Sequence, residues 1–402
     1  MERTLLIVGA SARAAAFSAI RAGLRPTVAD RFADWDLTRL CRATRVDRYP
    51  EGIVSFLRSS PPETPWMYTG AMENRPDLIQ AMASSRRLLG NGPGTLRLVR
   101  DPTILSDSLR RAGFLVPECR REGDDVPADG SWLRKPIASA GGGGITVWRG
   151  PSHAGDQSGR ASYLQWRVAG LSCAAVYVAA GQRAVLIGMA RQLTGAAWCG
   201  TRSFHYSGSV GPFHPTPRLR ASLNRLGNGL SRQFGLIGLF GVDLILQGDR
   251  AWTVEVNPRY TASIEVLERG LGISAISLHV AACVRGSLPR PATGRADGIP
   301  NGKAIVYADH DTVIARSLTT TPPAVRWPVL ADIPPLGTHI GSGEPVATVF
   351  ADGRHFTEVI ERLQRRAVEL RGRVFPAQLT VSTADRPAAA ETPRAQPDEQ
   401  SR

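Results

Sequence analysis

Lysine is almost absent from this chain of 402 residues. Lysine and arginine together number 49, and only Lys135 and Lys303 are lysines, which leaves 47 arginines (49 less 2). With a formal net charge of +14, the chain is basic enough to attract phosphate backbones. Its arginines are dispersed, however, and accompany no RNP, zinc-finger or basic-zipper pattern, so no specific nucleic-acid partner is expected.

Other sequence features are missing as well. The five cysteines are scattered and never spaced as CxxC, which argues against a disulfide framework or a thiolate zinc site. The seven histidines form no HExxH spacing. No apolar run approaches the roughly 18 residues of a membrane span, and the N-terminus runs into a glycine turn rather than a signal pattern. We therefore expect a cytoplasmic protein without a membrane partner.

The first part of the chain has the pattern of a Rossmann-like unit. Residues 4–8 are apolar and end at Gly9, Ser11 is the expected N-cap of an alanine-rich helix that Gly23 closes, and a second strand follows at 26–30. Strand, helix and strand in this order predict a parallel sheet. The turn lacks GxGxxG spacing, so a dinucleotide site is only weakly supported.

The remaining segments predict a mixed architecture of α/β and α+β class. Glycines and a proline before residue 95 mark a domain boundary, and strands dominate from residue 132 onward. Helices are expected near residues 76–87, 103–112, 218–233 and 355–371, the last with apolar residues at helical spacing. The predicted parts are a Rossmann-like domain over 1–95, a strand-rich domain over 96–285, a β-rich C-terminal region with an amphipathic helix over 286–375, and a disordered tail over 376–402.

One of the two lysines precedes a glycine run. Lys135 is followed by a proline and then, between two expected strands, by Gly141, Gly142, Gly143 and Gly144. Four residues without Cβ atoms let backbone NH groups approach phosphate oxygens closely, and a lysine supplies a compact charge for the same ligand. The stretch therefore favours a phosphate-binding strand and loop. Lys303 lacks such neighbours, and we expect it to be an ordinary residue at the start of a strand.

A second group of polar residues lies about 110 positions later. Gly248 and the aspartate after it predict a hairpin turn, which brings Asp243 within about one residue of facing Glu255. Asn257 shares a face with Glu255 because side chains alternate along a strand. Two carboxylates and an amide oxygen suit Mg²⁺, which completes its coordination with phosphate and water.

Together these motifs resemble the ATP-grasp superfamily. The KP step with its glycine loop corresponds to the family's phosphate-binding strand and flap, and GVD with EVNPR corresponds to its metal-binding strands. The resemblance covers roughly residues 1–285 and implies a two-lobed ATP-grasp domain over 96–285. Segments such as YLQWRVAGLSCAAVYVA and EVNPRYTASIEVLERG look like the group described as predicted ATP-dependent carboligases.

The resemblance also implies roles for individual residues. It places ATP between the two lobes, with Lys135 on the α and β phosphates and the glycine loop closing over them. Magnesium, with manganese as the alternative metal, would lie on Asp243, Glu255 and Asn257. Arg259 would meet the γ-phosphate or the carboxylate that receives it.

Three departures from the family pattern concern the site. The hinge that usually reads Gln-Glu holds Gln165 and Trp166 here, followed by Val168, so the customary adenine-site acid is not visible. Arg100 stands in place of a lysine that many members carry upstream of the clamp. No substrate-binding histidine or acid can be matched, although the loop around His205, Tyr206 and Ser209 is a candidate.

The activity implied by the resemblance is ATP-dependent ligation. A small-molecule carboxylate would be phosphorylated to an acyl phosphate and then attacked by an amine. Dimers are common in this superfamily, so a homodimer is a candidate assembly, and the sequence leaves the oligomeric state open. One alternative is a carboxylase of the biotin-carboxylase type, although the segment LGTHIGSGEPVATVF, whose turns resemble those of biotinyl domains, holds no lysine to carry biotin. The other is an arginine-rich nucleic-acid binder with a degenerate ATP site.

Overall fold

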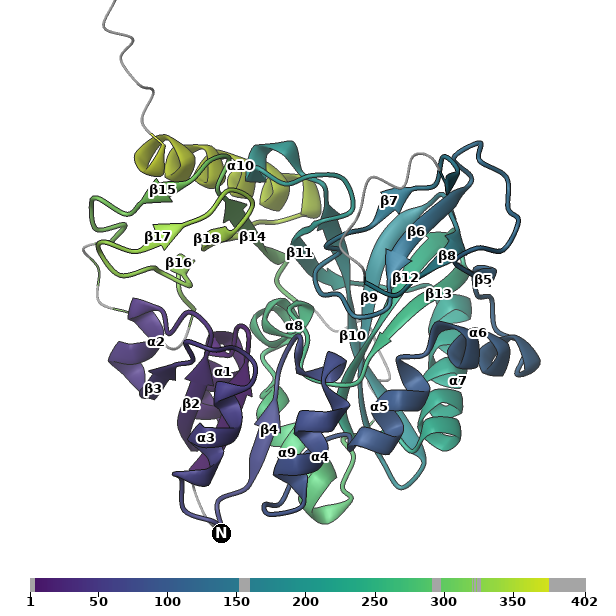
Figure 1. Cartoon of the computed structure of the whole chain (residues 1–402), viewed down its shortest axis with the longest axis horizontal. Coiled ribbons are helices and arrows are strands. Elements are labelled where there is room, and N and C mark those ends of the chain that lie inside the picture. Colours follow the sequence, from purple (N-terminus) through teal and green to yellow (C-terminus); the bar gives the residue numbers. More distant parts are fainter. Residues whose placement is uncertain are drawn as a thin grey trace, which may run out of the picture.

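The chain folds into three packed parts that confirm the predicted mixed class (Figure 1). A computed structural model describes residues 4–151, 160–290, 298–319, 321, 323 and 327–375. The tail predicted to be disordered, 376–402, lies outside the described residues. In Figure 1 the N-terminal unit lies below the C-terminal β-rich region, and the large sheet stands beside both.

The N-terminal unit is a four-stranded parallel sheet, as predicted, with strand order β3-β2-β1-β4. Its strands are β1 (Thr4–Gly9), β2 (Arg25–Asp30), β3 (Arg42–Arg45) and β4 (Trp66–Tyr68). Its helices are α1 (Arg13–Arg21), α2 (Trp35–Leu40), α3 (Gly52–Arg58), the 3-10 turn η1 (Met72–Asn74) and α4 (Pro76–Ala83). Because chain order places β4 on the opposite side of β1 from β2, the sheet has a switch point at the carboxyl ends of β1 and β4.

Two local expectations for this unit need correction. Ser11 does not cap α1: the N-cap is Ala12, whose backbone NH donates to the Asp30 carboxylate at 2.6 Å. The helix expected to reach residue 87 ends at Ala83, because the hydroxyls of Ser84 and Ser85 donate to backbone carbonyls of its last turn. A serine side chain that bonds the backbone in this way competes with helix continuation.

An eight-stranded sheet forms the largest layer, in the order β13-β12-β9-β10-β11-β14-β18-β16. The strands from the middle of the chain are β9 (Leu171–Ala180), β10 (Arg183–Thr194), β11 (Tyr206–Phe213), β12 (Gly238–Gln247) and β13 (Arg250–Asn257). A smaller sheet, β5-β8-β6-β7, lies over it and consists of β5 (Cys119–Arg121), β8 (Ser162–Trp166), β6 (Trp132–Pro136) and β7 (Thr146–Val147). The space between the two sheets contains the candidate site.

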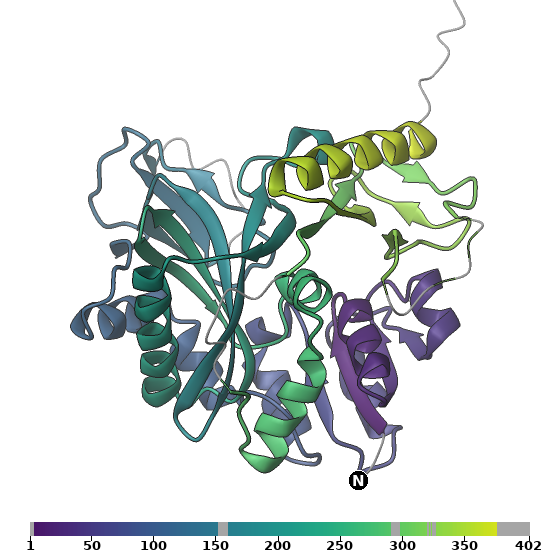
Figure 2. The same cartoon turned by 180° about the vertical axis from the view of Figure 1, so that it is seen from behind.

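Further helices pack against the sheets, as the two opposite views in Figures 1 and 2 show. They are α5 (Pro93–Val99), α6 (Pro102–Arg111), η3 (Ala197–Cys199), α7 (Pro217–Phe234), α8 (Ser263–Leu271) and α9 (Ala275–Arg285). The expected helices near 103–112 and 218–233 are confirmed as α6 and α7. Apolar residues of α1, α8 and α9 share one core with β1 and β9, so the N-terminal unit is packed directly onto the large sheet.

The C-terminal region continues the large sheet through the pairing of β11 with β14. Its elements are β14 (Asn301–Tyr307), β15 (Thr312–Val313), β16 (Leu330–Ala331), β17 (His339–Ile340), β18 (Pro345–Asp352) and α10 (Phe356–Val374). The amphipathic helix is confirmed, because α10 buries Val359, Leu363, Ala367 and Leu370 in the core of this region. The predicted domain boundaries remain predictions, since one sheet runs across the boundary at 285–286.

Lys303 differs from its expected role. It lies in β14 with a side chain only 6% exposed, and its ammonium contacts the buried Glu265 carboxylate of α8 at 2.9 Å. The expected place near the start of a strand is confirmed, but Lys303 is a buried member of an ion pair and not an ordinary strand residue.

The lengths and composition of the described helices bear on whether any of them could cross a membrane. No single helix among the described residues is long and apolar enough to cross a membrane, although the bent pair of α8 and α9 passes that test together at 105°. Most of α8 is buried against the rest of the protein, which explains its apolar character.

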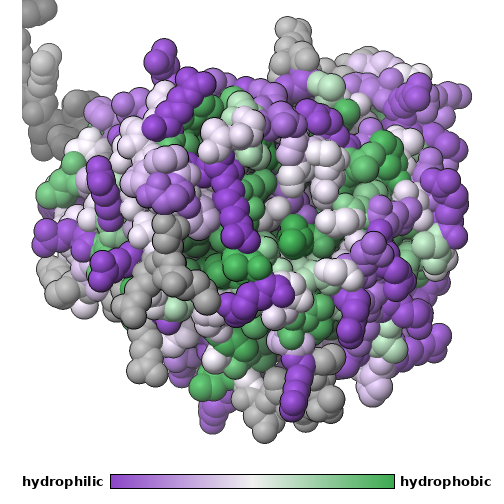
Figure 3. All heavy atoms as spheres, turned by 90° about the horizontal axis from the view of Figure 1, so that it is seen from below, coloured by the Kyte–Doolittle hydropathy of each residue, from purple (hydrophilic) through white to green (hydrophobic). Residues whose placement is uncertain are grey.

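On the face seen from below, hydrophobic and hydrophilic residues are interspersed (Figure 3). The five cysteines are all free thiols, as expected.

Candidate active site

Lys135 lies on β6 and faces the space between the two sheets. Its side chain is buried, and its ammonium donates to the amide oxygen of Gln165 at 3.1 Å and lies 5.7 Å from the ring centre of Tyr163. Burial alone would lower the pKa of Lys135, but Tyr163 and Glu255 outweigh that effect and the pKa is raised. The lysine is therefore a fixed positive charge with only neutral hydrogen-bond partners among the described residues.

The glycine run forms a tight turn between β6 and β7. Three of its residues, Gly141, Gly142 and Gly144, have positive φ, and a Cβ at Gly142 would lie 2.0 Å from the carbonyl oxygen of Phe204. The backbone NH of Tyr206 donates to the Gly141 carbonyl at 2.9 Å. Two candidate loops thus meet here, and glycine is required at 142 both by backbone conformation and by space.

The β12–β13 hairpin forms as predicted and places its carboxylates together. Asp243 pairs directly with Glu255 in the strand register, and Asn257 donates its amide NH to Asp243 at 3.0 Å. Gln192 of β10 donates to the other oxygen of Asp243 at 2.8 Å. Burial first, and repulsion from Glu255 second, raise the pKa of Asp243 to about 6. Negative charge is therefore concentrated at this point.

Arg100 compensates part of that charge. It forms an ion pair with Glu255 and also donates to the amide oxygen of Asn74 at 3.2 Å. Burial would raise the pKa of Glu255, but the positive charges of Arg100 and Lys135 lower it. The arginine expected to replace an upstream lysine is thus placed at the site by the structure.

The residues fit a divalent cation in their chemistry. Asp243, Glu255 and Asn257 offer hard oxygen ligands, and a cation would relieve the repulsion that raises the pKa of Asp243. The described residues contain no group of three or more histidine, cysteine or carboxylate side chains that could hold a metal. This set would therefore depend on the amide oxygen of Asn257 and on ligands from outside the protein, as magnesium sites with phosphates do.

Arg259 follows the same hairpin and is held from several sides. One of its amino groups donates to Glu73 at 2.6 Å and to the amide oxygen of Asn257 at 3.2 Å. Its other amino group donates to the carbonyl of Tyr260 at 3.2 Å.

Three residues of this site, Glu73, Gln192 and Tyr163, were not predicted from the sequence. For Glu73 a signal was present, because the residue comes just after β4, at the carboxyl edge of a parallel sheet.

The hinge residues lie on β8, which pairs with β6, the strand of Lys135. Gln165 is buried and donates to the Val254 carbonyl at 3.4 Å, whereas Trp166 is 38% exposed and packs edge-on against Trp252 at 5.6 Å. Alternation along β8 explains the difference, because neighbouring side chains point to opposite faces. Val168 follows the strand and also lines the space.

A single cavity of about 740 Å³ joins these groups. Residues from both sheets line it, including Arg100, Lys135, Gly141, Gly142, Gln165, Trp166, Val168, Tyr206, Asp243, Glu255, Asn257 and Arg259. Of the substrate-loop candidates, Tyr206 lines the cavity, and its hydroxyl is 2.7 Å from that of Ser209. Ser209 is buried and 3.0 Å from the Ser263 hydroxyl, while His205 is absent from the lining.

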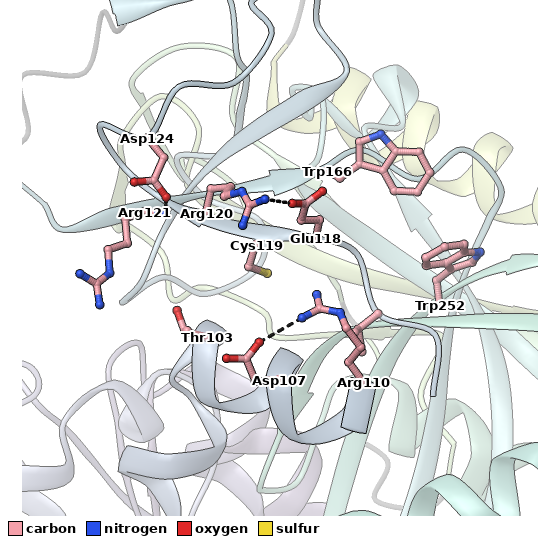
Figure 4. Close-up of a pocket in the computed structure, with 11 residues that line it drawn as sticks. Thr103, Asp107, Arg110, Glu118, Cys119, Arg120, Arg121, Asp124, Trp166 and Trp252 are labelled. Carbon is pink, nitrogen blue, oxygen red and sulfur yellow. Dashed lines mark hydrogen bonds and ion pairs between the residues drawn. The ribbon is translucent and has the colours of Figure 1, made fainter. Parts of the chain in front are cut away.

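A second cavity lies on the outer side of β5, and Figure 4 shows its lining. Its volume is about 780 Å³, and Trp166 and Trp252 form one end. Four of its charged side chains form ion pairs, Arg110 with Asp107 and Arg120 with Glu118. The cavity lacks Lys135 and the facing carboxylates of the β12–β13 hairpin, which line the space between the sheets.

The comparison with known families agrees with this geometry. Residues 99–263 match the ATP-grasp domain, which confirms the resemblance to that superfamily. Over 86 residues the chain is 35% identical to a formate-dependent phosphoribosylglycinamide formyltransferase of Geobacter metallireducens. That match covers 21% of this chain and spans 21% of the relative's own length.

Solved structures share the fold over most of the chain. The biotin carboxylase domain of Hydrogenobacter thermophilus 2-oxoglutarate carboxylase, in complex with MgADP and bicarbonate, has a TM-score of 0.68 at 13% identity, over 90% of this chain and 89% of that one. An L-amino acid ligase from Bacillus licheniformis has a TM-score of 0.65 at 13% identity, over 91% and 97%. At these identities the likeness shows the fold alone. Membership of the carboligase group stays a prediction.

Proposed function

We propose that this chain is an ATP-dependent ligase that activates a substrate carboxylate as an acyl phosphate for attack by an amine. One observation carries the proposal: a buried lysine, a glycine turn, two facing carboxylates and an arginine line the same cavity of about 740 Å³. Such a set of charges matches a nucleoside triphosphate with its metal, because phosphoryl transfer depends on positioning and charge neutralisation. The ATP-grasp match over 99–263 supports the same conclusion.

ATP would lie along the cavity from the hinge to the hairpin. The adenine would lie at Gln165, Trp166 and Val168. Lys135 and the NH groups of the glycine turn, residues 141–144, would hold the phosphates. Asp243, Glu255 and Asn257 would hold Mg²⁺, or Mn²⁺ as the alternative, which when bound neutralises phosphate charge.

The reaction would take place in two steps. A carboxylate oxygen of the substrate attacks the γ-phosphorus, the bond to the β-phosphate oxygen breaks, and ADP leaves with that electron pair. An amine then attacks the acyl carbon, loses a proton, and expels inorganic phosphate. Lys135 and Arg259 balance the charge that spreads over the transferred phosphoryl group, so no protein nucleophile is required.

The proposed substrates are small molecules, a carboxylate and an amine, and a homodimer is the candidate assembly. Strand β11 begins with Tyr206, which lines the cavity and is linked through the Ser209 hydroxyl to Ser263. This row of hydroxyls leads from the glycine turn towards the loop that carries Arg259. It is the proposed side of the cavity from which the acceptor carboxylate enters.

A screen of ADP release over carboxylate and amine pairs tests this function. ADP release that needs both partners, with mass spectrometry showing an amide product, is the expected result. ADP release that depends on bicarbonate would instead favour a carboxylase of the biotin-carboxylase type. Absence of ATP turnover in every mixture, with steeply salt-dependent binding to random DNA, would favour a nucleic-acid binder with a degenerate site.

The metal assignment yields a separate prediction. Replacing Glu255 by glutamine keeps the shape of the side chain but removes one of two facing carboxylate charges, so Mg²⁺-dependent nucleotide binding should weaken about tenfold. Calorimetric titration of Mg²⁺ in the presence of ADP measures this. The exposed Glu361 of α10 provides the matched control, and Glu361→Gln should leave the titration unchanged. An unchanged titration for Glu255→Gln would contradict the assignment.

A further inference from the structure

A turn of the N-terminal unit contacts the candidate site from outside the ATP-grasp match. The turn is η1, which follows β4 at the switch point of the parallel sheet. Its residue Glu73 has a side chain only 1% exposed, and one carboxylate oxygen accepts from Arg259 at 2.6 Å. The other carboxylate oxygen is buried and has no hydrogen-bond partner among the described residues. A buried carboxylate with one oxygen unsatisfied is costly unless it serves a purpose.

Glu73 is the carboxylate that contacts Arg259 in the described structure. The remaining bonds of the guanidinium go to the neutral acceptors of Tyr260 and Asn257, both at 3.2 Å, and its Nε is buried without a partner. Gly70, two residues after β4, lies close to the guanidinium, since a Cβ there would be 3.6 Å from its central carbon. Hence the N-terminal unit provides both the glycine that lies beside the guanidinium and the carboxylate that pairs with it.

The residue that follows Glu73 shows why the position of this turn matters. The second guanidinium at the site, that of Arg100, forms an ion pair with Glu255 of the hairpin. Asn74, the next residue, accepts from Arg100 at 3.2 Å and donates to the Ser139 carbonyl before the glycine run at 3.0 Å.

We infer that Glu73 is a positioning residue for phosphoryl transfer, fixing the guanidinium of Arg259 at the end of the cavity that holds the transferred group. Glu73 does not line the cavity itself and therefore acts through Arg259. The inference rests on the proposed function, and it assigns the N-terminal unit a part in the chemistry: residues 186 positions apart form one functional pair. Such an outer partner typically changes activity or affinity by about 10- to 100-fold when removed.

A binding experiment on the full chain distinguishes positioning from a merely structural role. The probes are Mg·AMPPNP, which carries a γ-phosphoryl group, and Mg·ADP, which does not. Calorimetry would compare the wild type with Glu73→Gln, the milder Glu73→Asp, Arg259→Ala and the double variant of Glu73→Gln with Arg259→Ala. Asp77→Asn serves as the matched control, because Asp77 is a 60% exposed carboxylate on the following helix that pairs with Arg75 instead.

The expected result is selective for the γ-phosphoryl group. Glu73→Gln should lower the affinity for Mg·AMPPNP about tenfold and leave that for Mg·ADP nearly unchanged, with Glu73→Asp in between and Asp77→Asn like the wild type. In the Arg259→Ala background Glu73→Gln should cause no further loss, because residues that act as a unit are not additive.

Three outcomes would overturn the inference. They are an equal loss for both nucleotides, losses that multiply in the double variant, and a Glu73→Gln variant that binds both probes like the wild type. If the wild type binds neither probe, the proposed function itself fails and the inference fails with it. Wild-type binding with an unaffected Glu73→Gln variant rejects the inference alone.

Discussion

The two lysines of this chain are both buried, yet their surroundings differ. Lys135 donates to a neutral amide oxygen beside a cavity, and several polar atoms close to that cavity lack partners among the described residues: Glu73 Oε2, Arg100 Nε, Arg259 Nε and Thr261 Oγ1. Lys303 instead contacts a carboxylate directly at 2.9 Å. Buried polar atoms without hydrogen-bond partners indicate a site that binds a ligand. Buried charges that are fully paired within the protein indicate a contact that stabilises the fold.

The contacts around Lys303 connect all three parts of the molecule. Glu265 of α8 pairs with Lys303 of β14 and with Arg13 of α1, and Arg13 pairs in turn with Asp332 at 2.9 Å. The hydroxyl of Thr348 donates to the same Asp332 at 2.5 Å. We call the four charged residues, Arg13, Glu265, Lys303 and Asp332, the junction cluster. Asp36, also buried, lies 3.9 Å from Arg13 at the edge of this cluster.

The largest effect expected from this comparison is on stability. Glu265→Gln would leave Arg13 and Lys303 buried without their shared carboxylate, and breaking a buried ion pair typically costs about 3–5 kcal/mol. Urea unfolding should show that loss, while the folded fraction should still bind Mg·ADP. A loss below about 1 kcal/mol, the range of exposed ion pairs, would show that the junction cluster is not a stabilising centre.

Lowering the pH should reduce the stability difference between the wild type and Glu265→Gln over a defined pH range. Burial would raise the pKa of Glu265, but Arg13 and Lys303 lower it to about 2, below its usual value of 4.5. The ion pairs therefore stabilise the fold above about pH 4.5, and their contribution of about 3 kcal/mol is lost as the pH falls towards 2. The stability gap between wild type and Glu265→Gln, measured by urea unfolding across this range, should shrink as the pH falls.

Another buried group changes the absolute stability in a neighbouring pH range. Burial lowers the pKa of His279 from 6.5 to about 4, so the unfolded chain takes up a proton first and stability falls between these values. Wild type and Glu265→Gln share this histidine, and its effect cancels in their difference. A gap that stayed constant from pH 5 to the acid limit would contradict the assignment to Glu265.

A smaller effect is expected on the ligand side of the comparison. Gly142→Ala adds a Cβ that meets the Phe204 carbonyl at 2.0 Å on a residue whose φ is +77°. Strain of about 1–3 kcal/mol would displace the turn and weaken nucleotide binding. Gly94→Ala is the control, because a Cβ at Gly94 meets nothing within 4 Å. Equal nucleotide affinities for the two variants would show that the turn does not contact the phosphates.

Local features of the site could be predicted from the sequence, and long-range ones could not. The turn at Gly248 fixes the register of β12 and β13, so the facing of Asp243 and Glu255 follows from neighbouring residues. Glu73 and Arg259 are brought together only when the N-terminal sheet packs on the large one. In the same way, the partner of Lys303 lies on another element 38 positions away, and nothing in the pattern of β14 reveals it.

The fold shows the same division. Hydrophobic periodicity and turn residues predicted the N-terminal βαβ unit, α7 and α10, because these elements depend on local patterns. The order of the eight strands in the large sheet depends on which edges meet after collapse, and strand β14 joining β11 had no local signal. Caps and helix ends were wrong where a side chain bonded the backbone instead, as at Asp30 and Ser84.

One measurement tests the central claim, that Lys135 serves a ligand and Lys303 serves the fold. Lys135→Arg keeps the charge but not the compact geometry, and ADP release from Mg·ATP with the best substrate pair should fall about 100-fold at unchanged stability. Lys303→Arg should leave ADP release by the folded protein unchanged and lower its stability. Wild-type ADP release from Lys135→Arg would contradict the account.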